Sequence, residues 1–255
     1  MLLAIDIGNT NIKIGVFDGE NLVHSFRLST IHGRTGDEYG LDILAQLASK
    51  KISEAQIDGA IMSSVKPGLN YTFERACEYY MGVKPLVVGS GIKIGLNVKY
   101  DNPREVGADR IVNSVAAFYT YGGPCITIDC GTATTFNVIS EKGEFLGGAI
   151  GHGLKSAAES LSESAEKLPK VELYMPRKVV GRTTITNMQS GLLQGYIGMA
   201  ERIVRLMKEE TGYTDAKVVA TGGLSEIIKR NSDVIDILDR TLTLRGLNII
   251  YSLNS

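Results

Sequence analysis

The stretch Leu2–Phe17, "LLAIDIGNTNIKIGVF", decides the fold. Its apolar run Leu2–Ile7 predicts a buried strand, and the alternation of Asn11–Phe17 is typical of a half-buried strand. A polar turn joins the two, and Asp18-Gly19 predicts a hairpin into a third strand over residues 22–28. The chain therefore begins with three antiparallel strands, and a carboxylate, Asp6, lies near the end of the first.

The same plan recurs after Pro124. "CITIDCG" at residues 125–131 matches "LLAIDIG", "TTFNVIS" at 134–140 takes the place of the second strand, and "FLGGAI" at 145–150 that of the third. Such internal repetition outranks any local motif as a signal of fold. Because strands mix with helical patterns in both copies, we predict an α/β protein with two similar lobes, residues 1–118 and 119–255, around a nucleotide cleft.

Helical spacing follows each set of three strands. In the first lobe it predicts a helix from Asp37, as the cap, to residue 49, with Leu41, Leu44 and Leu47 on one face. Further helices are expected over 69–82, from about residue 103 to the glycines at 122–123, over 154–167 and over 184–210. Short strands are expected at 58–65, 85–89 and 216–221.

Composition excludes several classes of function. The formal net charge is −1, so there is no basic footprint for nucleic acid or an anionic membrane. Three scattered cysteines, Cys77, Cys125 and Cys130, have no zinc-site spacing, and their odd number argues against a disulfide framework. Asp6 interrupts the first apolar run too early for a signal peptide. We expect a cytoplasmic protein whose cysteines are core residues.

The first turn suits an anionic ligand. Gly8 allows close approach of the backbone, and the amides from Gly8 to Asn11 can form a concave anion site to which Lys13 adds a charge. Asp6 cannot contact phosphate directly, so it is better explained as a magnesium ligand, often through water. The alternative is a hairpin whose polar turn merely faces solvent. Repetition of the turn argues against that alternative.

The second turn supplies Asp129, Gly131, Thr132, Thr134 and Thr135. Two such turns facing each other across a cleft would hold the phosphates of a nucleotide, as in the superfamily of sugar kinases, Hsp70 and actin. The chain has no GxxxxGK[ST] loop, and no G-x-G-x-x-G follows the first strand, which excludes a P-loop and a Rossmann site. "VVATGGLSEI" at residues 218–227 suits adenine or ribose lying against backbone.

A candidate acceptor site lies in "NPREVGADRIVNS" at residues 102–114. Phosphoryl transfer often needs a base for the attacking hydroxyl, and Asp109 falls in the first turn of a predicted helix, which favours its carboxylate form. Arg110 can hold a substrate carboxylate, and Gly107 permits close approach. The alternative is an ordinary surface pair of Asp109 and Arg110.

Taken together, "DIGNTN", "NPREVGADRIVN", "IDCGTATTF", "KLP", "TTITNMQSGLLQGYIG" and "ATGGL" resemble the type III pantothenate kinase family, which includes the Bvg accessory factor proteins. The resemblance runs in order over nearly the whole chain. It implies ATP-dependent phosphorylation of pantothenate to 4'-phosphopantothenate, the first step of coenzyme A synthesis. It also implies a duplicated ribonuclease-H-like or actin-like fold and a homodimer.

The resemblance also assigns residues to roles. It places the proton acceptor at Asp109, Mg²⁺ near Asp6, and K⁺ or NH₄⁺ at Asp129. The ATP-binding residues that it implies are Asp6, Ile7, Gly8, Asn9, Thr10, Asn11, Ile12, Lys13 and Thr132. The pantothenate-binding residues that it implies are Tyr100, Gly107, Ala108, Asp109, Arg110 and, from across the dimer interface, Thr184.

Four positions depart from the family's usual pattern. Lys66 stands in "SSVKP" where the family has "SSVVP", and Thr183 stands where an Asn usually precedes Thr184. His152 replaces a proline and Ser164 an arginine. Two alternatives stay open: another phosphate-transferring or polyphosphate-hydrolysing enzyme of the same fold, and a nucleotide-binding regulatory protein without turnover. The complete acceptor motif favours the kinase.

Overall fold

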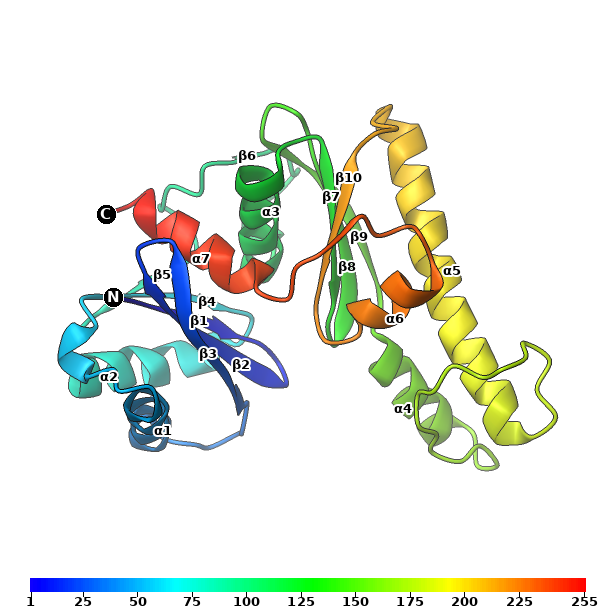
Figure 1. Cartoon of the computed structure of the whole chain (residues 1–255), viewed down its shortest axis with the longest axis horizontal. Coiled ribbons are helices and arrows are strands. Elements are labelled where there is room, and N and C mark those ends of the chain that lie inside the picture. The colour runs from blue at the N-terminus through cyan, green and yellow to red at the C-terminus, as the bar shows by residue number, and fades with distance from the viewer. The chain divides into compact units, whose positions relative to one another are not determined.

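The computed structural model describes residues 1–255 and divides into two compact units (Figure 1). Unit 1 comprises Met1–Leu96, Tyr100–Tyr119 and Thr241–Ser255, and unit 2 comprises Asn97–Lys99 and Thr120–Arg240. The sequence division into 1–118 and 119–255 thus differs from the structure at the C-terminus. The last helix groups with unit 1, because its apolar side chains are buried there: Leu244 lies against Gly15, and Tyr251 lies against Gly59.

Unit 1 contains a five-stranded sheet in the order β3-β2-β1-β4-β5. Strands β1 (Leu2–Ile7), β2 (Asn11–Asp18) and β3 (Asn21–Ser29) are antiparallel, while β4 (Gly59–Ser64) and β5 (Pro85–Val87) extend the sheet in parallel from β1. The predicted opening of three antiparallel strands is confirmed.

Alternation along β1 separates the two faces of this sheet. Leu3, Ile5 and Ile7 join the core formed with helices α1 (Gly36–Ser49) and α2 (Asn70–Met81). Asp6 therefore points to the opposite face. There α7 (Leu242–Ser252) lies along the sheet, as Figure 1 shows in red.

Helix α1 differs from the sequence expectation in its cap and in its buried face. Thr35, not Asp37, is the N-cap, because its side chain accepts from the Glu38 amide while Glu38 bonds back in a capping box. The buried stripe is Tyr39, Ile43 and Leu47, whereas Leu41 is 57% exposed. Tyr39 determines which face of α1 is buried, since its ring packs on that of Phe73 with centroids 4.7 Å apart.

Unit 2 repeats the plan with a sheet in the order β11-β10-β7-β8-β9-β6. Its first five strands correspond to β5-β4-β1-β2-β3, so the predicted duplication is confirmed. Their bounds are β7 (Cys125–Cys130), β8 (Ala133–Ile139), β9 (Glu144–His152), β10 (Lys217–Thr221) and β11 (Ile237–Leu238). The short β6 (Asn97–Val98) was not predicted and pairs with the start of β9.

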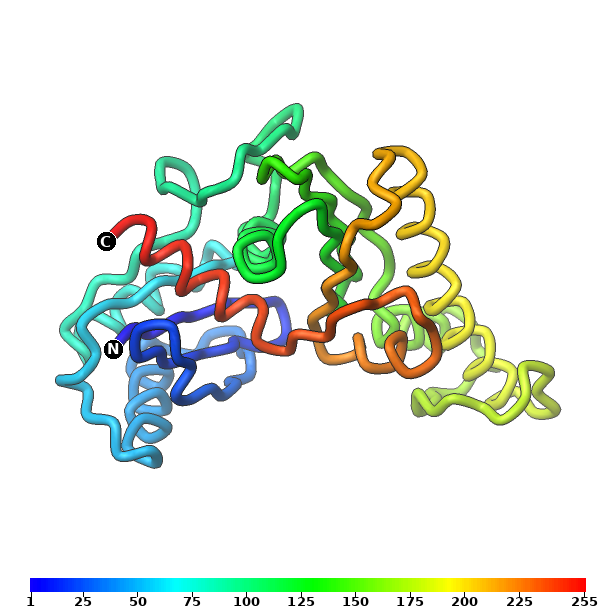
Figure 2. The backbone as a smooth tube through the Cα atoms, turned by 45° about the horizontal axis from the view of Figure 1, so that its top comes forward, coloured from blue at the N-terminus to red at the C-terminus, as the bar shows by residue number.

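Helices pack on one face of this second sheet. The core joins Cys130 and Phe136 of the sheet to Leu193 and Tyr196 of α5 (Thr184–Thr211) and to Leu154 of α4 (Leu154–Ser164). Figure 2 follows α5, in yellow, along the strands. Helices α3 (Ala108–Tyr121) and α6 (Ser225–Asn231) and three short 3₁₀ turns, at 54–56, 67–69 and 103–105, complete the elements. None of the helices is both long and apolar enough to cross a bilayer.

The three cysteines should be inert in the folded protein. All are buried, and burial raises the pKa of Cys77, Cys125 and Cys130 from 9.0 to about 12. Because the thiolate is the reactive form, we predict no reaction of the native protein with a thiol-specific chromogenic disulfide at mildly alkaline pH, and full reaction of all three cysteines in denaturant.

These shifts also set a pH dependence. An unfolded chain loses the thiol protons first, so their contribution to the free energy of unfolding falls as the pH rises above 9.0 towards about 12. A thiol that reacts in the native protein as fast as a free one would contradict this packing.

Candidate functional site

The carboxylate of Asp6 is held on both oxygens by neighbouring strands. In the sheet register Asp6 lies opposite Lys13 of β2 and beside Ser63 of β4. The Ser63 hydroxyl donates to Oδ1 over 2.9 Å, and Lys13 Nζ lies 3.3 Å from Oδ2. Lys13 Nζ also donates to Thr243 Oγ1 of α7 over 3.4 Å. With Asp6 only 6% exposed, its carboxylate has a defined orientation.

The first turn is closed by its own backbone. The Gly8 amide donates to Asn11 O over 3.1 Å, so this amide is committed to the turn and not to an anion as expected. Thr30 holds the turn from the other side: its Oγ1 donates to Gly8 O over 2.9 Å and its amide to Thr10 O over 3.0 Å. In a trans peptide the N–H opposes the C=O, so the Asn9 amide points away from Thr30.

Other members of the predicted ATP loop divide into two kinds. Ile7 and Ile12 are fully buried in the core of unit 1, so only their backbone can serve a ligand. Asn9, Thr10 and Asn11 are exposed at the turn. A Cβ on Gly8 would lie 2.7 Å from Asn11 O, which explains the glycine.

The second turn repeats this design around Asp129. The Gly131 amide donates to Ala133 O over 3.1 Å, as Gly8 does to Asn11. Gly222, with φ +92°, lies directly on the acidic residue, since a Cβ there would be 2.7 Å from Asp129 Oδ1. The first glycine of the "ATGG" segment, Gly222, is therefore needed for close packing beside the carboxylate, whereas a Cβ on Gly223 would meet nothing within 4 Å.

The two carboxylates have different neighbours on the adjacent strands. Where Asp6 has Lys13 opposite and Ser63 beside it, Asp129 has Thr135 opposite and Thr221 beside it. Thr135 is 8% exposed and its Oγ1 is buried without a hydrogen-bond partner. An orphaned hydroxyl facing a carboxylate is a donor set for a hard cation, as is the Asp6 carboxylate for Mg²⁺.

Thr134 and Thr132 have different surroundings. Thr134 is fully buried in β8, where its hydroxyl lies 2.9 Å from Tyr196 Oη and donates to His152 O over 2.9 Å. It therefore cannot contact a phosphate as the sequence suggested. Thr132 is exposed in the turn, and its carbonyl accepts from Ser156 Oγ over 2.9 Å.

The acceptor motif forms a compact group in unit 1. Asp109 lies in the first turn of α3, and its Oδ1 accepts the Arg110 amide over 2.9 Å. A Cβ on Gly107 would lie 2.6 Å from that oxygen, so a larger residue there would displace the Asp109 carboxylate. Arg110 is only 5% exposed, and its guanidinium lies 5.8 Å from the centre of the Tyr100 ring. Burial of Arg110 contradicts the ordinary surface pair.

Thr184 is the first residue of α5 and is exposed. Its predecessor Thr183 is the N-cap and forms a capping box with Thr186. Because Thr and Asn both cap helices well, Thr183 can serve as the N-cap in place of the asparagine usual in the family. Ala108 begins α3 between Gly107 and Asp109.

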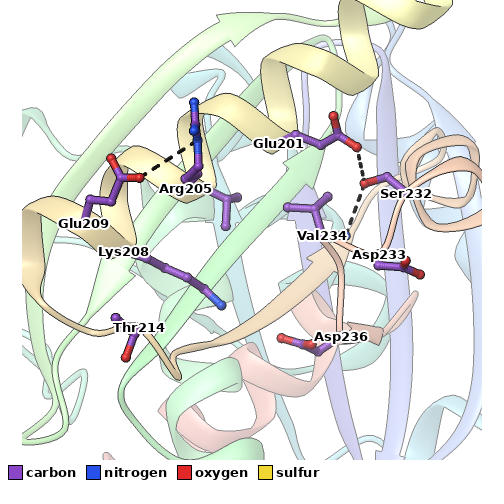
Figure 3. A pocket seen from close by; sticks show the side chains of 10 residues that line it. Glu201, Arg205, Lys208, Glu209, Thr214, Ser232, Asp233, Val234 and Asp236 are labelled. Atoms are coloured by element: carbon purple, nitrogen blue, oxygen red, sulfur yellow. Dashed lines mark hydrogen bonds and ion pairs between the residues drawn. The ribbon is translucent and has the colours of Figure 1, made fainter.

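A surface pocket of unit 2 lies apart from all these residues. Figure 3 shows it between the C-terminal half of α5 and the segment 232–236. Four of its polar residues form two pairs: Ser232 donates to Glu201 over 2.7 Å, and Arg205 forms an ion pair with Glu209. The pocket holds none of the predicted site residues.

Sequence reasoning missed Ser63, Thr243 and Tyr196. The strand that ends in "MSS" was a signal for Ser63, since parallel pairing brings strand ends together at one edge of a sheet. No pattern linked Thr243 or Tyr196 to the turns, because both belong to helices far away in the sequence.

Comparison with known proteins agrees with these features. The sequence profile of type III pantothenate kinase matches residues 2–206. A type III pantothenate kinase from Geobacillus sp. (strain WCH70) is 48% identical over 254 residues, which cover 100% of this chain and 98% of the relative.

Solved structures show the fold. A candidate Baf family transcriptional activator from Campylobacter jejuni matches with a TM-score of 0.62 at 18% identity, covering 98% of this chain and 97% of the other. A candidate N-acetylmannosamine kinase from Listeria monocytogenes matches with a TM-score of 0.51 at 12% identity, covering 98% of each chain. The fold is the duplicated actin-like fold of such sugar kinases, and the chain belongs to the type III pantothenate kinase family.

Proposed function

We propose that the protein transfers the γ-phosphoryl group of ATP to the primary hydroxyl of pantothenate, the reaction of its family, with Asp109 as the proton acceptor. The observation that carries this proposal is the group formed by Tyr100, Gly107, Asp109 and Arg110 at the start of α3. A carboxylate, a buried guanidinium and a close backbone approach are together what an acceptor with a hydroxyl and a carboxylate requires.

Asp109 is the general base in this proposal. Its Oδ1 accepts the Arg110 amide at the N-terminus of α3, a position where a helix stabilises negative charge. In the proposed step Asp109 takes the hydroxyl proton, the hydroxyl oxygen bonds to the γ-phosphorus, and the bond to the ADP oxygen breaks. Arg110 and the neighbouring backbone hold the pantothenate carboxylate, while Tyr100 supports the guanidinium.

The first turn serves the phosphates of ATP. Its carbonyls are tied back by Thr30, so the amide N–H groups on the opposite side of the turn point towards the ligand, beside the exposed side chain of Asn9. Lys13 supplies positive charge. Mg²⁺, held through Asp6, would neutralise charge on the phosphates.

The monovalent cation of the family is proposed at Asp129. In unit 1 the place opposite the carboxylate carries the Lys13 ammonium, and in unit 2 it carries the neutral Thr135. K⁺ or NH₄⁺ bound by Asp129 and the Thr135 hydroxyl would supply the charge that a lysine supplies in unit 1. Thr132 is the ATP contact proposed beside it.

A homodimer belongs to the same proposal. Unit 2 exposes apolar side chains at Ile150, Val180 and Ile185, which are 64%, 81% and 48% exposed. Ile185 follows Thr184 directly, so an interface that covers it would present Thr184 to the partner subunit. A cytoplasmic location accords with the use of ATP and with three unpaired cysteines.

The first experiment is an assay of ADP formation with ATP, Mg²⁺ and pantothenate. We predict ADP formation that depends on pantothenate, is not supported by other small alcohols, and is accompanied by no phosphate release. The variant Asp109→Asn should lower kcat by about 10²–10⁴-fold, the usual contribution of a general base. The matched control is Asp101→Asn, which makes the same change at an exposed carboxylate of the same segment and should keep wild-type activity.

Two outcomes would change the proposal. Near-normal turnover by Asp109→Asn would remove its role as base. ATP binding by the wild type without consumption of pantothenate would favour the regulatory protein instead.

A second experiment addresses the cation. Wild-type turnover should require K⁺ or NH₄⁺, and Thr135→Lys should turn over in their absence because its ammonium takes the place of the ion. Thr135→Val, which keeps the volume and removes the hydroxyl, should raise the K⁺ concentration for half-activation by about 3- to 10-fold. An unchanged K⁺ requirement in both folded variants would contradict this site.

A further inference from the structure

A hydrogen-bonded chain runs from helix α5 to the second turn. Thr134 Oγ1 donates its single proton to His152 O over 2.9 Å. The 2.9 Å contact between Thr134 Oγ1 and Tyr196 Oη must therefore use the proton of the tyrosine. The order of donation is Tyr196 to Thr134 to His152. Both side chains are buried, Tyr196 at 5% and Thr134 at 0% exposure.

Cys130 flanks the turn on its other side. Cys130 and Thr134 are cross-strand partners, and Cys130 belongs to the buried core that contains Tyr196. Burial raises the pKa of the Tyr196 hydroxyl, so it stays protonated as the chain requires. The two residues on either side of the second turn, Cys130 and Thr134, are thus both buried.

The far end of the chain reaches the turn itself. The anchored His152 carbonyl is followed by Gly153, whose Cα lies so close to the turn that a Cβ would be 2.5 Å from Gly131 O and 2.2 Å from Thr132 O. Ser156 in the next helical turn donates to Thr132 O over 2.9 Å. These contacts hold the carbonyls of the turn towards α4, so the Thr132 N–H, which opposes Gly131 C=O, points the other way.

We propose that Tyr196 is a positioning residue of the ATP site, which fixes the orientation of the turn Gly131–Thr132 through Thr134 and the His152 carbonyl. The inference rests on the proposed role of this turn in ATP binding. It explains how the chain can carry histidine at position 152: the position acts through its carbonyl, while the side chain is exposed. In unit 1 Thr30, which follows β3, ties back the first turn, and Tyr39 of α1 bonds to the backbone on both sides of it: its hydroxyl donates to Ser29 O over 3.3 Å and accepts the Ile31 amide over 3.1 Å.

The test uses variants that each remove one hydroxyl group with little change in the shape of the side chain. Tyr196→Phe and Thr134→Val each break the chain, and each should raise the KM for ATP and the dissociation constant of ATP by about 3- to 10-fold, the range of one buried hydrogen bond. The KM for pantothenate should stay unchanged, because the acceptor group lies in unit 1. The double variant should be little worse than either single one, since both break the same chain.

Two further variants separate positioning from general weakening. Tyr121→Phe removes a hydrogen bond of equal length, from Tyr121 Oη to Asp239 Oδ2 at 2.9 Å in the same unit, and should leave the affinity for ATP at the wild-type value. Thr134→Ser keeps the hydroxyl and should bind ATP more tightly than Thr134→Val.

The outcomes are distinguishable from a failure of the proposed reaction. Because the affinity for ATP is measured directly, it can be compared even if the wild type phosphorylates no pantothenate. Wild-type affinity in Tyr196→Phe, or an equal loss in Tyr121→Phe, would overturn the positioning role while leaving the kinase proposal intact. Additive losses in the double variant would also overturn it.

Discussion

The site in unit 1 depends on how one buried carboxylate is satisfied. Asp6 is removed from water at the end of β1, and such a charge is costly unless it is paired and hydrogen-bonded. Ser63 and Lys13 provide these partners only because β4 and β2 meet β1 in the observed register. A slip of one residue in either pairing would turn the partner to the opposite face of the sheet. The strand register therefore determines which side chains can pair with Asp6.

The duplicated fold places a carboxylate at the same sheet position in both units, with different side chains around it. Asp129 occupies in unit 2 the register position of Asp6, with Gly222 against it and a threonine in the place of the lysine. Each turn begins with a glycine amide closed on its own backbone, and each has its carbonyls tied back by the residues that follow the third strand. The shared architecture orients amides, and in the proposed function the differing side chains determine which cation accompanies each turn.

The sequence allowed the duplicated sheets to be predicted because alternation and apolar runs report burial directly, as in Leu2–Ile7 and Cys125–Cys130. The grouping of Tyr100 with Arg110 followed from a resemblance and not from spacing. Helix α7 was missed as part of unit 1, and Leu41 was placed in the core wrongly, because two overlapping apolar stripes satisfy the helical period. Roles of Thr243 and Tyr196 depend on contacts across long sequence separations, which periodicity does not encode.

The measurement that tests this account most directly is the affinity for ATP with and without Mg²⁺, by calorimetry, in the wild type and in Asp6→Asn. Asn keeps the shape of the side chain and an acceptor for Ser63 but removes the charge. The account predicts that Mg²⁺ strengthens ATP binding by the wild type and has little effect on the folded variant. Equal strengthening by Mg²⁺ in both proteins would contradict the role of Asp6 and, with it, the reading of the first turn as the phosphate site.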